Sequence, residues 1–427
     1  MSGSDGNKMN GGLSEGARLF DRASQMFETD GASEQCALLF EQAGQAFEKE
    51  NAPVRQSAMA YNRAGMCRFK CSDDTSAEAA DFERARDLMK SLPDRNGDPL
   101  MAIIRSNLAE CKARSGEREE AAKLYRQSAV TLSDLMYDEL SKGSAGEAFD
   151  QYVGVQKSLA QLYRDMGEYI QAQTCFTRVI SLIENHSQRS DQTDSMLAGF
   201  YNARGTVRYR VKDYAGEVED CTRAILLSER VGDDLPGLGI MYSNRGEAYE
   251  MLGMYDAMIV DMRQAASIFE KCGEMEGAKE MLFRSTFSIA KGLELSERLF
   301  EAAKTYGAAA ELMQELRDET DEGEDTSSML KAEAACRISR AACLCRCELH
   351  LYYDSLREYN RAAALLEGLE DRGALSKLES LYLLRSELYE AFDELEEAKA
   401  DYLRSKAISE RLMQTDEQQP QQPQEQV

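Results

Sequence analysis

The residues with the most reactive side chains lie between positions 343 and 350. Cys343, Cys347 and His350 stand at i, i+4 and i+7, so one face of a helix would carry all three. Thiolates and an imidazole at this spacing can hold a soft metal ion. The alternative is ordinary core packing, because buried thiols are common and Cys343 also falls on a small packing position of the repeated unit described below. We favour packing, for this segment and for Cys67 and Cys71, and expect no metal site.

Other catalytic signals are also missing from the sequence. Nucleophilic and general-base catalysis usually recruit histidine, and the chain has two, His186 and His350, neither in a recognisable motif. No glycine-rich phosphate loop follows a strand, and no HExxH or EF-hand spacing occurs. The sequence therefore predicts a protein that is not an enzyme, with no catalytic residue and no cofactor.

Charge and composition restrict the partners. The 427 residues carry a formal net charge of −25, which repels nucleic acid and anionic membranes. No apolar run approaches the roughly 20 residues of a membrane span, and the first twelve residues are polar and do not resemble a signal peptide. Eleven cysteines, an odd number, lie within helical patterns and favour a reducing compartment. We expect a cytoplasmic protein with no nucleic-acid partner and no membrane insertion.

One helical segment recurs along the chain. It reads Tyr61-Asn62-Arg63-Ala64-Gly65, Tyr201-Asn202-Ala203-Arg204-Gly205 and Tyr242-Ser243-Asn244-Arg245-Gly246. Its last position is expected to be small so that a neighbouring backbone can approach closely. The register extends in both directions and gives small or tolerated residues at Ser24, Gly65, Ala109, Ala160, Gly205, Gly246, Lys291, Cys343 and Ser386.

A second helix follows each of these segments. Its mostly bulky position is filled by Phe40, Phe82, Tyr125, Phe176, Cys221, Met262, Gly307, Tyr359 and Tyr402. Three residues later comes a compact one: Ala43, Ala85, Ser128, Val179, Ala224, Ala265, Ala310, Ala362 and Ser405. A bulky residue beside a small one on one face suits two closely packed antiparallel helices. The turn between the helices is expected at Gly31, Gly116, Gly167 and Gly253, each in a left-handed conformation.

This pattern resembles the tetratricopeptide repeat. The usual tryptophan and closing proline are missing, and the period exceeds the common one of about 34 residues, as in the longer-period members of the family. The resemblance implies an all-α fold: a right-handed α-solenoid of about nine tandem antiparallel helix pairs. It places repeats one to three in 17–137, four to seven in 151–317, and eight and nine in 329–412. A loop at 138–150, an acidic loop at 318–328 and disordered ends at 1–16 and 413–427 complete the organisation.

The resemblance also implies a peptide-binding groove, because the first helix of each pair lines the inner surface of such a solenoid. In the second to fifth units the groove positions carry six cationic residues against two acidic ones, Glu110 and Asp165, whereas acidic residues dominate in the other units. With two amides that could grip a peptide backbone, the predicted site consists of Asn62, Arg63, Lys70, Arg114, Lys157, Arg164, Asn202 and Arg210.

Two interpretations of this basic stretch remain open at the level of sequence. The cations can pair with acids on neighbouring helices, or they can bind an acidic or C-terminal peptide. The leading functional hypothesis is an adaptor or scaffold for protein and peptide partners. The alternatives are a regulator whose peptide ligand changes the shape of the solenoid, and an RNA-binding helical repeat, which the acidic balance argues against.

Overall fold

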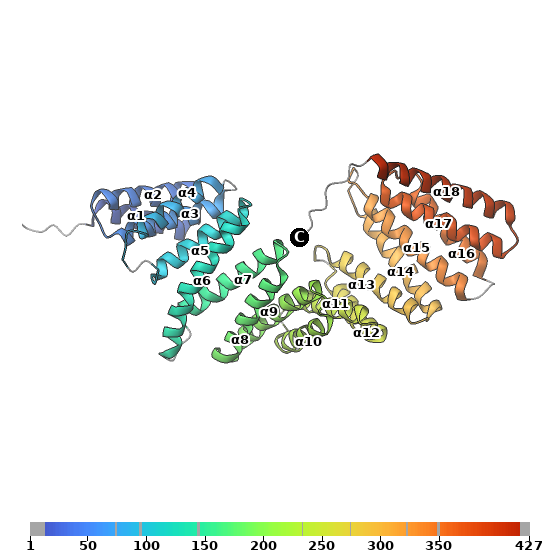
Figure 1. The fold of residues 1–427 in the computed structure, drawn as a ribbon, viewed down its shortest axis with the longest axis horizontal. Coiled ribbons are helices and arrows are strands. Elements are labelled where there is room, and N and C mark those ends of the chain that lie inside the picture. Colours follow the sequence, from blue (N-terminus) through green and yellow to red (C-terminus); the bar gives the residue numbers. More distant parts are fainter. Residues whose placement is uncertain are drawn as a thin grey trace, which may run out of the picture. The chain divides into compact units, whose positions relative to one another are not determined.

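The computed structural model describes residues 13–72, 75–93, 96–142, 146–232, 234–273, 275–321, 323–347 and 351–418. Within these ranges the chain forms helices and the turns between them, and no strand. The chain divides into two compact units, Met1–Val211 and Lys212–Val427 (Figure 1). The all-α fold predicted from the sequence is confirmed.

The first unit contains nine of the eighteen helices found in the described residues. They are α1 (Glu15–Asp30), α2 (Glu34–Lys49), α3 (Val54–Cys71), α4 (Thr75–Met89), α5 (Pro99–Arg114), α6 (Arg118–Ser141), α7 (Glu147–Asp165), α8 (Tyr169–His186) and α9 (Asp191–Arg210). Each helix packs against the next along the chain, as Figure 1 shows for α1 to α4.

The second unit continues the same pattern. Its helices are α10 (Tyr214–Val231), α11 (Leu235–Met251), α12 (Tyr255–Lys271), α13 (Ala278–Leu295), α14 (Leu299–Asp318), α15 (Ser327–Cys347), α16 (Tyr352–Leu366), α17 (Arg372–Ala391) and α18 (Leu395–Gln418). In chain order the eighteen helices of the described residues alternate between first helices, which have odd numbers, and second helices, as expected for tandem helix pairs.

Helix bounds differ from the expected loops and ends. Residues 138–141 belong to α6, and 147–150 belong to α7, so the expected loop between them is much shorter. The acidic segment lies between α14 and α15, close to where it was expected. Helix α1 begins at Glu15 and α18 continues to Gln418, so both ends are more helical than composition indicated. Residues 1–12, Gly143, Glu322 and 419–427 lie outside the described residues.

The turns inside the helix pairs depend on glycine conformation. Gly31, Gly116, Gly167 and Gly253 have φ values of 79°, 86°, 78° and 72°, as predicted. A glycine adopts this backbone without the steric penalty of a Cβ atom. Glu297 and Asp393 make the corresponding turns in later pairs with φ values of 58° and 61°, which explains why glycine alone did not identify those turns.

Glycines at two helix contacts, Gly65 on the first helix α3 and Gly44 on the second helix α2, make room for aromatic side chains, whereas a neighbouring backbone was expected at Gly65. A Cβ atom on Gly65 would lie 2.7 Å from Cε1 of Phe82, and one on Gly44 would lie 2.8 Å from Cε2 of Tyr61. The ring of the facing helix therefore rests directly on the glycine. The bulky residue of the second helix, Phe82, thus packs against the small position of the first helix.

The register was wrong by one residue in the seventh pair. Lys291 is exposed and its ammonium group pairs with Glu250, while Ala290 is fully buried and Tyr306 provides the buried ring. Gly307, the residue after Tyr306, had been assigned to the bulky position, which shifted the expected register by one residue. In the ninth pair Tyr402 is 54% exposed, because the buried position belongs to the residue before it, Asp401.

Asp401 belongs to a repeated buried ion pair. Arg385 on α17 donates from Nε and Nη2 to the two carboxylate oxygens of Asp401 on α18, at 2.5 and 3.0 Å. Its Nη1 donates to Asn360 Oδ1 on α16 at 2.6 Å. One guanidinium thus joins three consecutive helices, and both charged side chains are at least nine-tenths buried.

The same arrangement recurs at the preceding members of the repeat. Arg245 on α11 donates to both oxygens of Asp261 on α12, at 2.7 and 2.8 Å, and to Thr222 Oγ1 on α10 at 3.0 Å. Arg204 on α9 donates to Thr177 Oγ1 on α8 at 3.2 Å. These arginines stand directly before the small position, and we call each one, with its partners, an arginine clamp.

A tyrosine three residues before each clamp arginine adds a second link. Tyr242 donates its hydroxyl to Glu229 Oε1 at 2.6 Å, and Tyr382 donates to Glu367 Oε1 at 2.5 Å. Burial, together with these carboxylate acceptors, raises the pKa of both phenols to about 12. The repeated sequence Tyr-x-x-Arg-small therefore encodes contacts to the preceding second helix as well as to its own partner helix.

The packing contact at Gly65 predicts opposite effects for two glycine substitutions. Gly65→Ala should destabilise the protein by about 1–3 kcal/mol, because the new methyl group overpacks against Phe82. Gly154→Ala on α7 has no atom within 4 Å of the new Cβ and should stabilise by about 0.5–1 kcal/mol through helix propensity. Chemical denaturation measures both. Equal effects of the two substitutions would contradict the proposed packing role of position 65.

The arginine clamp predicts a large difference between two arginines that bind the same carboxylate. Arg385→Leu should cost about 3–5 kcal/mol, because Asp401 loses its buried partner. Arg404 also contacts Asp401, at 2.9 Å, but its side chain is 58% exposed, so Arg404→Leu should cost at most about 1 kcal/mol. Denaturant unfolding of the two variants compares them directly. Similar losses would show that burial does not govern this site.

Candidate functional site

The eight predicted site residues all lie on first helices of the first unit. Asn62, Arg63 and Lys70 are on α3, Arg114 is on α5, Lys157 and Arg164 are on α7, and Asn202 and Arg210 are on α9. The surface formed by these odd-numbered helices is called the first-helix face. The structure does not gather the eight side chains into one site.

Two of them share a hollow on the first-helix face. Lys157 and Arg164 line a space of about 740 Å³ between α5, α7 and α9. Tyr125 and Phe176, the bulky residues of the second helices α6 and α8, reach into it from below. Gly154 on α7 and Gly199 on α9 also line the hollow, and a Cβ atom on either would meet nothing within 4 Å. The sequence pattern did not indicate these two glycines, which keep the space open.

The cations in this first-helix hollow are not neutralised internally. Lys157 is exposed and makes no ion pair with any described residue. Arg164 donates from Nη1 to Gln161 Oε1 at 3.3 Å and likewise has no carboxylate partner in the described ranges. Gln161 also donates to Asp165 Oδ1 at 2.8 Å, so an amide separates the arginine from the nearby acid. A ligand carboxylate can therefore reach both cations.

Besides Asp165, a second carboxylate, that of Glu110, lines the first-helix hollow. Glu110 on α5 accepts a hydrogen bond from the hydroxyl of Tyr125. Burial and this carboxylate raise the pKa of the Tyr125 phenol. Glu110 thus shares the lining with Lys157 but makes no ion pair with it in the described structure.

Two other predicted residues have structural contacts. Arg114 donates from Nη1 to Oε1 of the fully buried Glu78 at 3.3 Å, and its guanidinium lies 4.6 Å from the centre of the Phe69 ring. Asn62 is buried and accepts a hydrogen bond from Asn107 Nδ2 at 3.0 Å. For these two residues the structure favours pairing between neighbouring helices over contact with a ligand.

The remaining four lie outside the first-helix hollow. Arg63 is exposed and forms no ion pair in the described part of the chain, and Lys70 places its ammonium group 5.3 Å from the centre of the Phe27 ring. Arg210 is exposed in the last turn of α9, and Asn202 is partly buried on the same helix.

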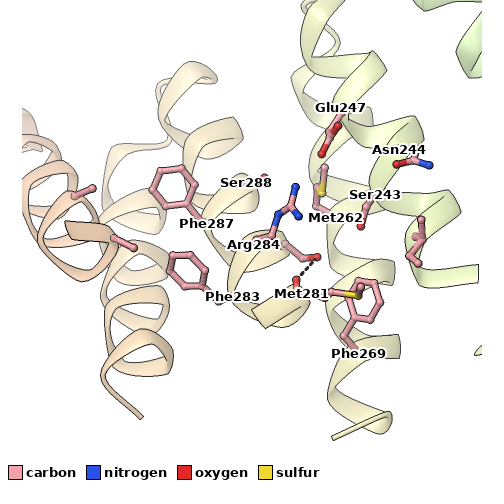
Figure 2. Close-up of a pocket in the computed structure, with 14 residues that line it drawn as sticks. Ser243, Asn244, Glu247, Met262, Phe269, Met281, Phe283, Arg284, Phe287 and Ser288 are labelled. Atoms are coloured by element: carbon pink, nitrogen blue, oxygen red, sulfur yellow. Dashed lines mark hydrogen bonds between the residues drawn. The ribbon is translucent and has the colours of Figure 1, made fainter. Parts of the chain in front are cut away.

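The second unit has a hollow of its own, which the charge-based analysis missed. It occupies about 450 Å³ along α11, α13 and α15. Figure 2 shows Phe283 and Phe287 on one side of α13 and Arg284 reaching toward the helix that carries Glu247. With the corrected small position Ala290, Phe287 stands three residues before it and so falls on a groove position. The ring of Tyr306 was the signal in the sequence that could have revealed this register.

Of the cysteines expected to pack in the core, Cys343 and Cys67 are buried, Cys347 is partly buried, and Cys71 is exposed. Cys343 is buried with Met258 and Tyr306, and burial raises the pKa of its thiol to about 12. Cys67 is also buried, donates to Cys36 Sγ at 3.6 Å, and has a thiol pKa raised to about 12. His350 lies outside the described residues. In the described ranges no three His, Cys, Asp or Glu side chains gather around a potential metal position, and no helix has the length and apolar character to cross a membrane.

Comparison with known proteins identifies the repeated unit. Residues 158–186, which span the end of α7 and all of α8, match the family model of the tetratricopeptide repeat. No curated protein sequence matches the chain.

Solved structures resemble the chain over most of its length. The apo form of RapI has a TM-score of 0.53 at 12% identity and covers 93% of this chain and 98% of its own. A STAND signal transduction ATPase with a tetratricopeptide repeat sensor, from Pyrococcus horikoshii, has a TM-score of 0.50 at 12% identity, covering 95% of this chain and 56% of its own. The C-terminal part of a tetratricopeptide repeat protein from Cytophaga hutchinsonii has a TM-score of 0.46 at 13% identity, covering 71% and 96%.

At these identities the likeness concerns the fold. The matched repeat, the alternating first and second helices of the described residues, and the two similar structures with TM-scores of 0.50 and above agree with one another. The chain is an all-α helical repeat protein of the tetratricopeptide type.

Proposed function

We propose that the protein is a non-enzymatic, cytoplasmic scaffold that binds peptide segments of protein partners in the first-helix hollow of α5, α7 and α9. The observation that carries this proposal is the pair Lys157 and Arg164, which line one hollow and have no carboxylate partner among the described residues. Cations that serve the scaffold are expected to pair internally, as Arg114 does with Glu78.

The chemistry of the hollow favours an acidic segment. An ammonium and a guanidinium on one helix can form charge-assisted hydrogen bonds with carboxylates of a bound peptide. The open space above Gly154 and Gly199 lets a peptide backbone approach the helices closely. A volume of about 740 Å³ suits a few residues, so affinity would come from a short segment.

A second candidate function is a peptide-responsive regulator. The specific observation in its favour is the apolar hollow of the second unit, whose Phe283 and Phe287 offer a different chemistry from that of the first-helix hollow. The similar fold of the Pyrococcus horikoshii protein, in which such repeats form a sensor, is compatible with this role. A scaffold remains the preferred proposal because it needs no change of shape.

Charge reversal in the first-helix hollow tests the scaffold proposal. Lys157→Glu with Arg164→Glu should weaken binding of a fluorescent, end-capped, Asp/Glu-rich peptide pool by roughly tenfold or more, since attraction becomes repulsion. Fluorescence anisotropy at rising salt gives the affinity, which for the unaltered protein should fall as screening increases. An Asn/Gln-rich pool serves as the uncharged comparison.

The matched control changes the same net charge elsewhere in the first unit. Lys123→Glu with Lys142→Glu alters an exposed lysine of α6 and the exposed lysine that caps its C-terminus, both outside the first-helix hollow, and it should leave affinity nearly unchanged. Circular dichroism must show equal helicity for all variants. If the double reversal at 157 and 164 stays folded and binds the acidic pool with the original affinity and salt response, this hollow is not the binding site.

A further inference from the structure

Helix α7 separates two hollows in the first unit. Lys157 lines the one on the first-helix face, whereas the preceding residue, Gln156, lines another on the opposite side. This second space lies between the second helices α6 and α8, with α7 beneath it, and has a volume of about 800 Å³. We call it the second-helix hollow.

The side-chain oxygen of Gln156 lacks a hydrogen-bond donor at this position. The residue is 2% exposed, and its Oε1 atom has no hydrogen-bond partner in the described structure. A buried amide oxygen without a donor is costly, and such atoms are rare unless a ligand or water completes them. Because Gln156 lines the second-helix hollow, an N–H or O–H group of a bound molecule can supply the missing donor.

Two arginines flank the same hollow from different helices. Arg126 on α6 and Arg178 on α8 are exposed, and neither forms an ion pair with a described residue. His186 on α8 also lines the space, and Asp134 is the one carboxylate in its lining. In a chain with a net charge of −25, two unpaired guanidinium groups beside one carboxylate form a local basic site.

Apolar side chains extend the site along α6. Val130 and Tyr137 line the hollow and are 65% and 57% exposed. The phenol ring offers a flat apolar surface with a polar end, as side chains in peptide-binding surfaces often do. The hollow therefore combines an anion site, a buried acceptor and an apolar wall.

We propose that the second-helix hollow is a separate binding site for a peptide segment, with an anionic side chain between Arg126 and Arg178 and an adjacent N–H or O–H group donating to Gln156 Oε1. Guanidinium groups bind carboxylates and phosphates through the same paired hydrogen bonds, so the anion can be a glutamate or a phosphorylated side chain. The peptide backbone supplies the donor in either case. This site is independent of the first-helix hollow and goes beyond the scaffold function proposed for it.

Three end-capped peptide pools with randomised flanks test the site and distinguish the two anions. The central residue is glutamate, phosphoserine or glutamine, and fluorescence anisotropy reports binding to the full chain. At least one anionic pool should bind roughly tenfold more tightly than the glutamine pool, and the stronger of the two identifies the anion. Equal binding of all three pools would overturn the proposal.

Charge removal then locates the binding. In the Lys157→Glu/Arg164→Glu background, Arg126→Gln with Arg178→Gln should abolish the remaining preference for the anionic pool. Lys123→Gln with Lys142→Gln removes the same charge from α6 and its C-terminal cap and should preserve that preference. The reversal at Lys157 and Arg164 should also leave binding to the second-helix hollow intact. If that reversal removes all anionic binding and the arginine pair removes none, the second-helix site is excluded while the first-helix proposal stands.

Gln156→Met gives a readout that a purely structural glutamine would not show. The substitution keeps the volume and removes the unpartnered oxygen, so the melting temperature should rise. Affinity for the anionic pool should fall about tenfold, because the ligand loses an acceptor. A lower melting temperature, which would mean that the amide already has a partner, or an unchanged affinity would each overturn the proposal.

Discussion

A guanidinium group shared by three consecutive helices holds the repeats in register. Arg385 binds Asp401 on its partner helix and Asn360 on the preceding second helix, and Arg245 repeats the arrangement with Asp261 and Thr222. A repeat array has no central core, so each pair is positioned by its neighbours alone. The planar fork of arginine suits this role because it satisfies two partners in fixed directions, which a lysine cannot do.

The clamp also decides which surfaces remain available for ligands. On α11 the clamp arginine Arg245, its acid Asp261 and the contact of Gly246 with Met262 occupy the inward face of the helix. Some outward residues, such as Lys157 on α7, make no ion pair within the described ranges. On α7 this division falls between adjacent residues, because Lys157 points into the first-helix hollow while Gln156 lies under α6 and α8. Gln156 is inward-facing as well, and its Oε1 atom has no hydrogen-bond partner in the described structure.

Much of the fold could be predicted from sequence because its signals are local. Glycine turns such as Gly116 and repeated segments such as Tyr242 to Gly246 report their own conformation. The register failed at Lys291 because Gly307 was assigned to the bulky position that Tyr306 occupies. The site was less predictable because charge does not reveal partners: Arg114 meets Glu78, 36 residues away on another helix, whereas Lys157 forms no ion pair with an acid of the described part of the chain. A buried side-chain oxygen that lacks a hydrogen-bond donor, such as Gln156 Oε1, cannot be recognised from the sequence.

A basic hollow can bind acidic peptides although the chain carries a net charge of −25, because the repulsion by the whole chain and the attraction by the local cations act over different distances. At physiological salt the screening length is about 8 Å, so most of the chain's negative charge acts weakly on a ligand seated against Arg126 or Lys157. Contacts within about 4 Å are screened far less, and the local cations dominate the bound state. At very low salt the whole field reaches the approaching ligand and opposes it. Excess negative charge therefore slows association of acidic partners without abolishing their affinity, and it discourages anions that fit neither hollow.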